Sequence, residues 1–200
     1  MISPVLQDRS RAYLLASVEV TRQAVDACLP AVLQAAETTA QCFRSGGKLL
    51  ICGNGGSAAD SQHIATEFTS TLRREYQRPA LPAIALTTDT SFLTARSNDF
   101  GFDQVFARQV EALGRPGDTL LGISTSGNSE NVVRAMDFAN HVGMRTIAFT
   151  GQREGRLRAS AQILVAVPSE VTGHIQEAHI ALYHTYVDLV EQMVFGGRQA

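Results

Sequence analysis

The sequence predicts an α/β protein, a three-layer sandwich of the Rossmann-like type in which helices cover both faces of a five-stranded parallel sheet. Three observations predict it. Five short apolar runs have strand length, helical segments alternate with them, and the runs are apolar throughout rather than alternating. With 200 residues and no obvious linker, we expect one domain over 1–200, with a helical region over 1–45 and the sandwich over 46–200.

The composition is that of an ordinary globular protein, with 44% apolar and 18% charged residues. The net charge of -2 and the lack of a basic block argue against nucleic acid as a partner. Cys28, Cys42 and Cys52 do not suggest a disulfide framework. Neither a signal peptide nor an apolar run of membrane-spanning length is present, so we expect a cytoplasmic protein without a membrane partner.

Helical spacing predicts one helix over about 10–27 and a second over 31–45, separated by Pro30. Both precede the first strand, so contact between subunits is one use for their apolar faces and packing on their own domain is the other. The remaining chain predicts strands at 49–52, 83–87, 119–123, 145–149 and 163–167, and helices at 90–97, 102–113, 130–141 and 172–195, with a turn at 98–101.

The first strand runs directly into a glycine loop and then a helix. Its loop is Gly53-Asn54-Gly55-Gly56-Ser57, and Ser57 is a plausible N-cap. Free backbone amides at a helix start, together with the helix dipole, favour a bound anion such as phosphate. The alternative is that these residues form only a turn.

A second unit of the same kind follows the third strand, with the loop Ser124-Thr125-Ser126-Gly127-Asn128-Ser129. Loops after parallel strands meet at one edge of the sheet, so both loops should face one ligand. The first loop is not G-x-G-x-x-G and no Lys follows it, which disfavours nucleotides. A sugar phosphate fits better.

His63 and Glu67 are four residues apart and therefore share a face of the helix after the first loop. Gln176 and His184 share a face of the last helix, and if the two faces meet, three or four zinc ligands converge. The alternatives are a solvated helix face for the first pair and a core histidine for His184.

With these motifs in place, the chain resembles the phosphoheptose isomerases (sedoheptulose 7-phosphate isomerases) of the SIS, or sugar isomerase, family. The resemblance covers nearly the whole chain. The serine loop alone marks any SIS domain, whereas its combination with the His63/Glu67 and Gln176/His184 pairs is specific to the isomerase. The segments that carry it are CGNGGSAADSQHIATE (52–67), PAIALTTDTSFLTARSNDFGF (82–102), QVEALGRPGDTLLGISTSGNSENV (109–132) and HIQEAHIALYH (174–184).

The resemblance implies a homotetramer with active sites between subunits, and Zn²⁺ held by His63, Glu67, Gln176 and His184. It implies that Glu67 and His184 are the acid/base pair, which moves a proton between C1 and C2 through an enediol to give D-glycero-D-manno-heptose 7-phosphate. The implied substrate-binding residues are Asn54, Gly55, Gly56, Ser57, Glu67, Asn98, Asp99, Ser124, Thr125, Ser126, Ser129 and Gln176.

The chain departs from the family pattern at two places. Thr71 stands where the family commonly has an arginine, unless Arg73 replaces it through a shifted loop. His174 replaces a usual Arg or Lys, and Gly173 stands where some members carry Asp. These changes bear on substrate choice more than on reaction class.

Two other functions remain to be weighed. One is a non-catalytic SIS binding module resembling the DnaA initiator-associating protein, although the relatives with that role lack the Glu67/His184 pair. The other is an isomerase of another sugar phosphate, or a phosphosugar-sensing regulator, for which the chain has no room for a DNA-binding domain.

Overall fold

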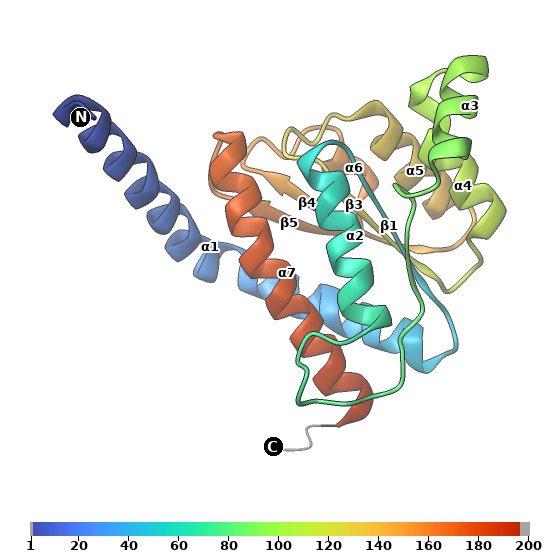
Figure 1. Cartoon of the computed structure of the whole chain (residues 1–200). Coiled ribbons are helices and arrows are strands. Elements are labelled where there is room, and N and C mark those ends of the chain that lie inside the picture. Colours follow the sequence, from blue (N-terminus) through green and yellow to red (C-terminus); the bar gives the residue numbers. More distant parts are fainter. Residues whose placement is uncertain (1, 197–200) are drawn as a thin grey trace.

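The computed structural model describes residues 2–196 and shows a sheet between two layers of helices (Figure 1). All five strands pair in parallel, in the order β2-β1-β3-β4-β5, so the predicted sheet is confirmed. The strands are β1 (Leu49–Gly53), β2 (Ala83–Ala85), β3 (Thr119–Ile123), β4 (Arg145–Gly151) and β5 (Ile163–Val167).

Alternate residues of each central strand enter different halves of the core. Leu49 and Ile51 of β1 point toward one helical layer, while Leu50 and Cys52 point toward the other. This double burial explains why the strand sequence is continuously apolar. The first layer contains α1 (Pro4–Arg44), α2 (Gly56–Thr69) and α7 (Thr172–Phe195); the second contains α3 (Thr90–Phe100), the 3₁₀ helix Phe102–Gln104, α4 (Val105–Leu113), α5 (Glu130–His141) and α6 (Leu157–Ser160).

The strand order reverses direction between β1 and β3, because β2 lies on one side of β1 and the later strands lie on the other. In open parallel sheets, ligands bind at the carboxyl ends of the strands at such a reversal. The fold therefore brings the loop after β1 and the loop after β3 together at the reversal, which is the expected place for a ligand.

The expected break at Pro30 is wrong, because α1 is one helix of 41 residues with Pro30 inside it. An internal proline removes one backbone hydrogen bond and costs about 3 kcal/mol. Cys28 and Val32, on either side of it, are fully buried in the core shared with α7 and β5. Tertiary packing on both sides outweighs the local penalty.

The turn expected at 98–101 is also wrong, since α3 continues through Asn98 and Asp99 to Phe100. Asp89 caps the start of α3 by accepting a hydrogen bond from the Phe92 amide at 2.9 Å. Gly101, at φ +88°, ends it. The capping residues, rather than the polar composition between them, set the helix limits.

His179 of α7 is completely buried, and its Nε2 donates to the Thr150 carbonyl at 3.1 Å. Burial lowers the pKa of His179 to about 4, although that hydrogen bond partly opposes the shift. Between about pH 6.5 and pH 4 the unfolded chain therefore binds a proton that the folded chain does not, and stability falls with falling pH.

We expect the free energy of unfolding to fall by up to about 3 kcal/mol from this group alone between pH 7 and pH 4. Urea denaturation across that range measures it, and His179→Leu should flatten the slope. An identical slope in wild type and variant would contradict the assignment.

Candidate active site

The loop after β1 presents backbone amides at this edge of the sheet. Gly55, at φ +55°, is the N-cap of α2, and no side chain caps the helix. The sequence interpretation of Ser57 as the N-cap is therefore wrong, because glycine geometry starts the helix earlier and leaves Ser57 buried in its first turn. Among the described residues, the amides of Gly56 and Ser57 have no protein acceptor. Both can bind an anion.

The loop after β3 gathers hydroxyl groups. The Oγ atoms of Ser124 and Ser129 are 2.8 Å apart, and Ser126 Oγ accepts from the Asn128 amide at 3.2 Å. A Cβ on Gly127 would lie 1.8 Å from the Glu154 carbonyl oxygen, so only glycine fits this turn. The loop holds a fixed set of donors ahead of α5.

Asn54 and Asn131 join the two loops. Each side-chain amide donates to the other's carbonyl oxygen at 2.9 Å, which bridges the start of α2 and the start of α5. The prediction that both loops share one edge of the sheet is confirmed. Asn131 was not singled out from the sequence, because nothing local distinguishes it from a solvated asparagine in a first helical turn.

Three side chains from α2 and α7 converge beside this edge. Ligand atoms of His63, Glu67 and His184 all lie within 4.8 Å of one another. His63 Nε2 is 3.0 Å from Glu67 Oε1, and the imidazole rings of His63 and His184 have centroids 5.1 Å apart. Residues more than a hundred positions apart in the sequence thus form one cluster.

Two residues behind the cluster were missed by sequence reasoning. The Tyr183 hydroxyl is 2.9 Å from His63 Nδ1, which fixes the ring with Nε2 toward Glu67. Asp60 is buried one turn before His63, and burial raises its pKa. Asp60 could have been found from the sequence, because it is three residues before His63 and so shares its face of the helix. Nothing in the sequence marks Tyr183 as a partner of His63.

His184 has an environment suited to proton transfer. Burial lowers its pKa below the usual value, the neighbouring His63 lowers it further, and Glu67 raises it. The imidazole is therefore mostly neutral at pH 7 and can accept a proton. Glu67 has only 15% of its side chain exposed, so its carboxylate is sheltered beside that imidazole.

Of the other predicted site residues, Gln176 contacts α2, whereas Asn98 and Asp99 do not. Gln176 packs on the first turn of α2, where its amide nitrogen is 2.6 Å from the position that a Cβ on Gly56 would take. Asn98 and Asp99 bond to each other at 2.8 Å and form no hydrogen bond with α2 or α7 in the part of the chain described. The structure brings Gln176 to the first loop but leaves the α3 pair apart.

Thr71, Arg73 and His174, at or beside the positions where the chain departs from the family pattern, each contact other residues of the chain. Arg73 forms an ion pair with Asp188 of α7 at 2.7 Å, and the Thr71 hydroxyl donates to backbone carbonyls within its own loop. His174 is buried against Tyr13 of α1, with ring centroids 4.4 Å apart.

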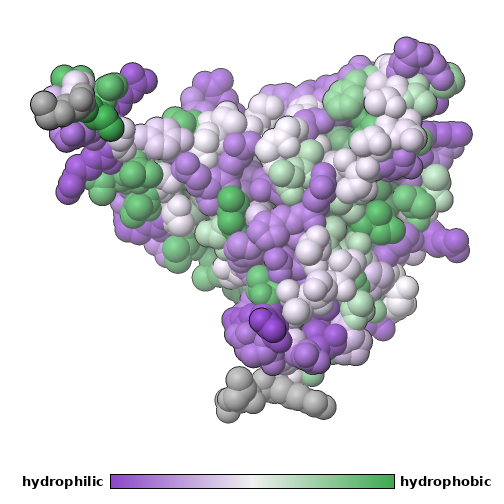
Figure 2. Space-filling model, viewed as in Figure 1, coloured by the Kyte–Doolittle hydropathy of each residue, from purple (hydrophilic) through white to green (hydrophobic). Residues whose placement is uncertain are grey.

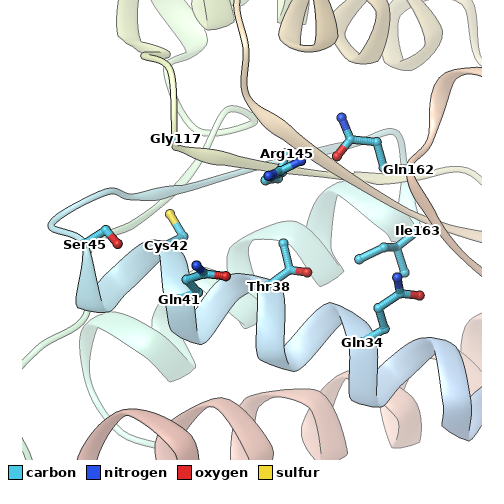
Figure 3. A pocket seen from close by; sticks show the side chains of 9 residues that line it. All are labelled: Gln34, Thr38, Gln41, Cys42, Ser45, Gly117, Arg145, Gln162 and Ile163. Atoms are coloured by element: carbon cyan, nitrogen blue, oxygen red, sulfur yellow. The ribbon is translucent and has the colours of Figure 1, made fainter.

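A cavity of about 540 Å³ lies away from this cluster (Figure 3). It opens at the amino ends of β4 and β5, beside Arg145 and Ile163, and is therefore at the opposite edge of the sheet from both loops. It holds none of the converging side chains and does not belong to the site.

Comparison with known proteins identifies the class of protein first. The SIS domain family matches residues 12–151, and with the sheet order and the serine loop this makes the chain an SIS protein.

Within that class, it is 54% identical over 180 residues to a phosphoheptose isomerase of Roseiflexus sp. (strain RS-1), covering 90% of each chain. Among solved structures, the phosphoheptose isomerase of Neisseria gonorrhoeae aligns with a TM-score of 0.88 at 46% identity, covering 94% of this chain and 99% of that one. The Francisella tularensis enzyme aligns with a TM-score of 0.89 at 40% identity, covering 93% and 98%. The chain belongs to the phosphoheptose isomerase family and is a sugar-phosphate isomerase.

No helix in residues 2–196 combines the length and the apolar character that a membrane span requires.

Proposed function

We propose that this enzyme converts sedoheptulose 7-phosphate into D-glycero-D-manno-heptose 7-phosphate through an enediol, with Glu67 and His184 as the acid/base pair. One observation carries the proposal. A sheltered carboxylate and a neutral imidazole lie within 4.8 Å, and the carboxylate stands on the helix α2 whose first turn offers free amides and contacts Gln176 of α7. The relatives with the same fold are named phosphoheptose isomerases.

The reaction has two steps, formation of the enediol and its conversion to the aldose, and each step needs two proton transfers. A base removes a proton from C1 of the ketose while an acid protonates the C2 oxygen, giving the enediol. The base then returns a proton to C2, and the O1 proton leaves to form the aldehyde. Glu67 suits the carbon-bound proton. Neutral His184 suits the oxygen-bound protons, because its N–H can donate a proton to the C2 oxygen while its other ring nitrogen takes up the O1 proton. The geometry also allows the reverse division of labour.

The loops are suited to the other end of the substrate. Free amides at Gly56 and Ser57 lie at the start of α2, where the helix dipole favours negative charge. The hydroxyls of Ser124, Ser126 and Ser129 add neutral donors opposite them. A phosphate bound there would hold the sugar with C1 and C2 directed along α2 toward Glu67.

The cluster also fits a metal ion. Two imidazoles and one carboxylate are a usual zinc donor set, and Tyr183 supplies the second hydrogen bond that a ligating histidine ordinarily has. We propose Zn²⁺ at His63, Glu67 and His184, with Gln176 as the fourth ligand suggested by the family pattern. Bound zinc would stabilise the negative charge that develops on the enediolate oxygens. Glu67 and His184 still hold and move the protons.

We further propose a homotetramer with active sites between subunits. The projecting half of α1 exposes large apolar side chains, including Val5 at 75%, Val18 at 65% and Leu14 at 64% (Figures 1 and 2). Such a face is usually covered by another chain. Asn98 and Asp99 lie apart from α2 and α7 of their own chain, so a neighbouring subunit would have to bring them to a site. Light scattering tests this assembly, and a monomer mass at working concentration would refute it.

The cytoplasm is the proposed compartment. Cys28, Cys42 and Cys52 are buried as free thiols, which suits a reducing environment. Cell fractionation would show this, and recovery outside the cytoplasmic fraction would refute it.

An assay over a panel of ketose phosphates tests the activity and its specificity together. We expect turnover of sedoheptulose 7-phosphate to an aldose phosphate, with lower kcat/KM for shorter ketose phosphates. Preference for another member of the panel would correct the substrate, and inactivity on every member would favour a binding module.

A further inference from the structure

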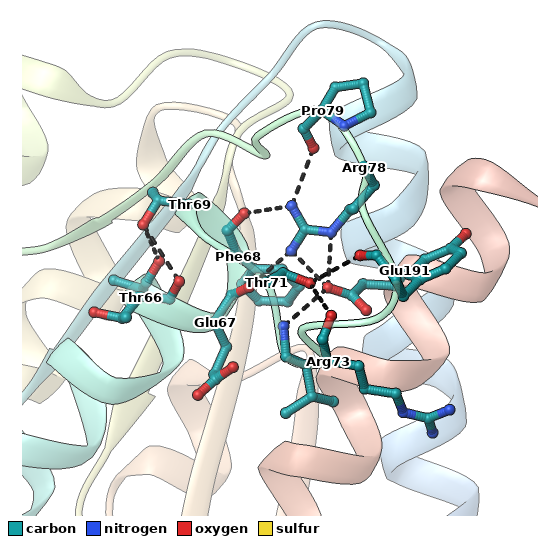
Figure 4. Close-up of polar contacts among 12 residues, drawn as sticks. Thr66, Glu67, Phe68, Thr69, Thr71, Arg73, Arg78, Pro79 and Glu191 are labelled. Carbon is teal, nitrogen blue, oxygen red and sulfur yellow. Dashed lines mark hydrogen bonds and ion pairs between the residues drawn. The ribbon is translucent and has the colours of Figure 1, made fainter.

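Arg78 lies in the loop between α2 and β2, yet only 1% of its side chain is exposed. Its guanidinium donates to the carboxylate of Glu191 at 2.7 Å through Nε, and Nη2 lies 2.6 Å from the same carboxylate. It also donates to the carbonyls of Glu67 at 2.7 Å and Phe68 at 2.8 Å (Figure 4). A single side chain therefore bridges α2 and α7.

The hydrogen bonds from Arg78 to the Glu67 and Phe68 carbonyls complete the end of α2. Carbonyls in the last turn of a helix have no partner within the helix, and a cation there is favoured by the helix dipole. The last turn of α2 contains no basic residue of its own. Arg78, from the loop that follows, donates to the Glu67 carbonyl and also to the Phe68 carbonyl, which accepts a second hydrogen bond from the Leu81 amide at 3.0 Å.

The ion pair between Arg78 and Glu191 fixes α7. Glu191 follows His184 by seven residues, which is two helical turns, so both lie on the same face of α7. Its carboxylate is as fully buried as Arg78, at 1% exposure. The ion pair thus joins the helix that carries Glu67 to the helix that carries His184.

We propose that Arg78 is a positioning residue, which sets the separation of Glu67 and His184 by tying the last turn of α2 to α7. The role rests on the proposed function of those two residues. Arg78 touches neither reacting group. It acts through the Glu67 backbone and the Glu191 carboxylate.

A buried ion pair of this kind is not explained by stability alone. Replacing both partners by apolar residues of similar size is often neutral or stabilising, whereas removing one partner is strongly destabilising. Removing both partners together therefore tests a role in positioning without a large loss of stability. The double variant Arg78→Met/Glu191→Met keeps the packing and loses the tie to the α2 carbonyls.

In that double variant we expect a Tm within a few degrees of wild type, a kcat lower by about 10- to 100-fold and a nearly unchanged KM, since small misplacement of reacting groups is costly and the phosphate loops are untouched. Zinc affinity, measured by calorimetry, should fall by about 10-fold or more. A crystal structure should show Glu67 and His184 further apart by on the order of 1 Å.

Two single variants provide a second test if the double variant does not fold. Glu191→Gln keeps an acceptor for Arg78 and leaves both α2 contacts intact, so it should lose stability more than kcat. Arg78→Lys keeps the charge but cannot reach both carbonyls, so it should lose kcat more than stability. Equal kcat in these two variants at wild-type level would overturn the role.

Lys48→Met is the matched control. It breaks the largely buried ion pair with Asp118 at the opposite edge of the sheet, and should lower Tm without changing kcat. A double variant with wild-type kcat, zinc affinity and Glu67–His184 distance overturns the proposal. Wild-type protein that does not turn over sedoheptulose 7-phosphate refutes the proposed function instead, and the distance in the double-variant structure still decides the role of Arg78.

Discussion

Glu67→Gln should lower kcat on sedoheptulose 7-phosphate by about 10²- to 10⁴-fold, the range for loss of a general acid/base. Glutamine keeps the size of the side chain and can still meet His63 Nε2, now 3.0 Å from the carboxylate. The chemical loss is the ability to take a carbon-bound proton. Steady-state kinetics measure it, and KM should change far less than kcat because the phosphate loops are intact.

Glu111→Gln is the control for this variant. Glu111 has half of its side chain exposed on α4, where it pairs with Arg108, and is remote from both loops. It should retain wild-type kcat. If Glu67→Gln also retains kcat within a factor of two while folding normally, Glu67 does not carry a proton in this reaction.

His184→Ala should produce a loss of similar size, about 10²- to 10⁴-fold in kcat. Alanine suits the middle of α7 and His184 is only partly buried, so we expect little change in Tm. Because the pKa of His184 is lowered below its usual value, wild-type activity should persist at pH 7 and decline only at a pH below the ordinary titration range of a histidine, where the imidazole becomes protonated.

Added imidazole distinguishes a chemical role from a structural one. It should restore part of the activity of His184→Ala and none of that of Glu67→Gln. His141→Ala, which removes an exposed histidine at the end of α5, is the control and should behave as wild type. The absence of rescue together with a large fall in Tm would indicate that His184 mainly supports the fold.

The sheet was predictable because strands buried on both faces are continuously apolar, a pattern that needs no tertiary knowledge. The predictions at Pro30 and Ser57 are wrong for different reasons. The signal at Pro30 is outweighed by contacts with residues far away in the sequence, where α1 packs on α7, whereas Ser57 is displaced locally, because the left-handed backbone of Gly55 starts α2 two residues earlier.

The site was predictable where its residues form short motifs. The serine loop and the His63/Glu67 pair are visible in the sequence because loop and helix geometry place them. Asn131, Tyr183 and Arg78 were not, since each acts on a residue that is tens of positions away or on another element. A sequence gives no hint of such pairings until the fold brings their elements together.

The central claim is that Glu67 and His184 move a proton between C1 and C2 through an enediol. Isomerisation in D₂O, followed by NMR of the product, tests it most directly. The account predicts deuterium at C2 of the heptose phosphate with wild-type enzyme and no exchange in Glu67→Gln. Absence of deuterium at C2 of the product even after many reversible turnovers would contradict it, because a proton held repeatedly on a carboxylate or an imidazole exchanges with solvent.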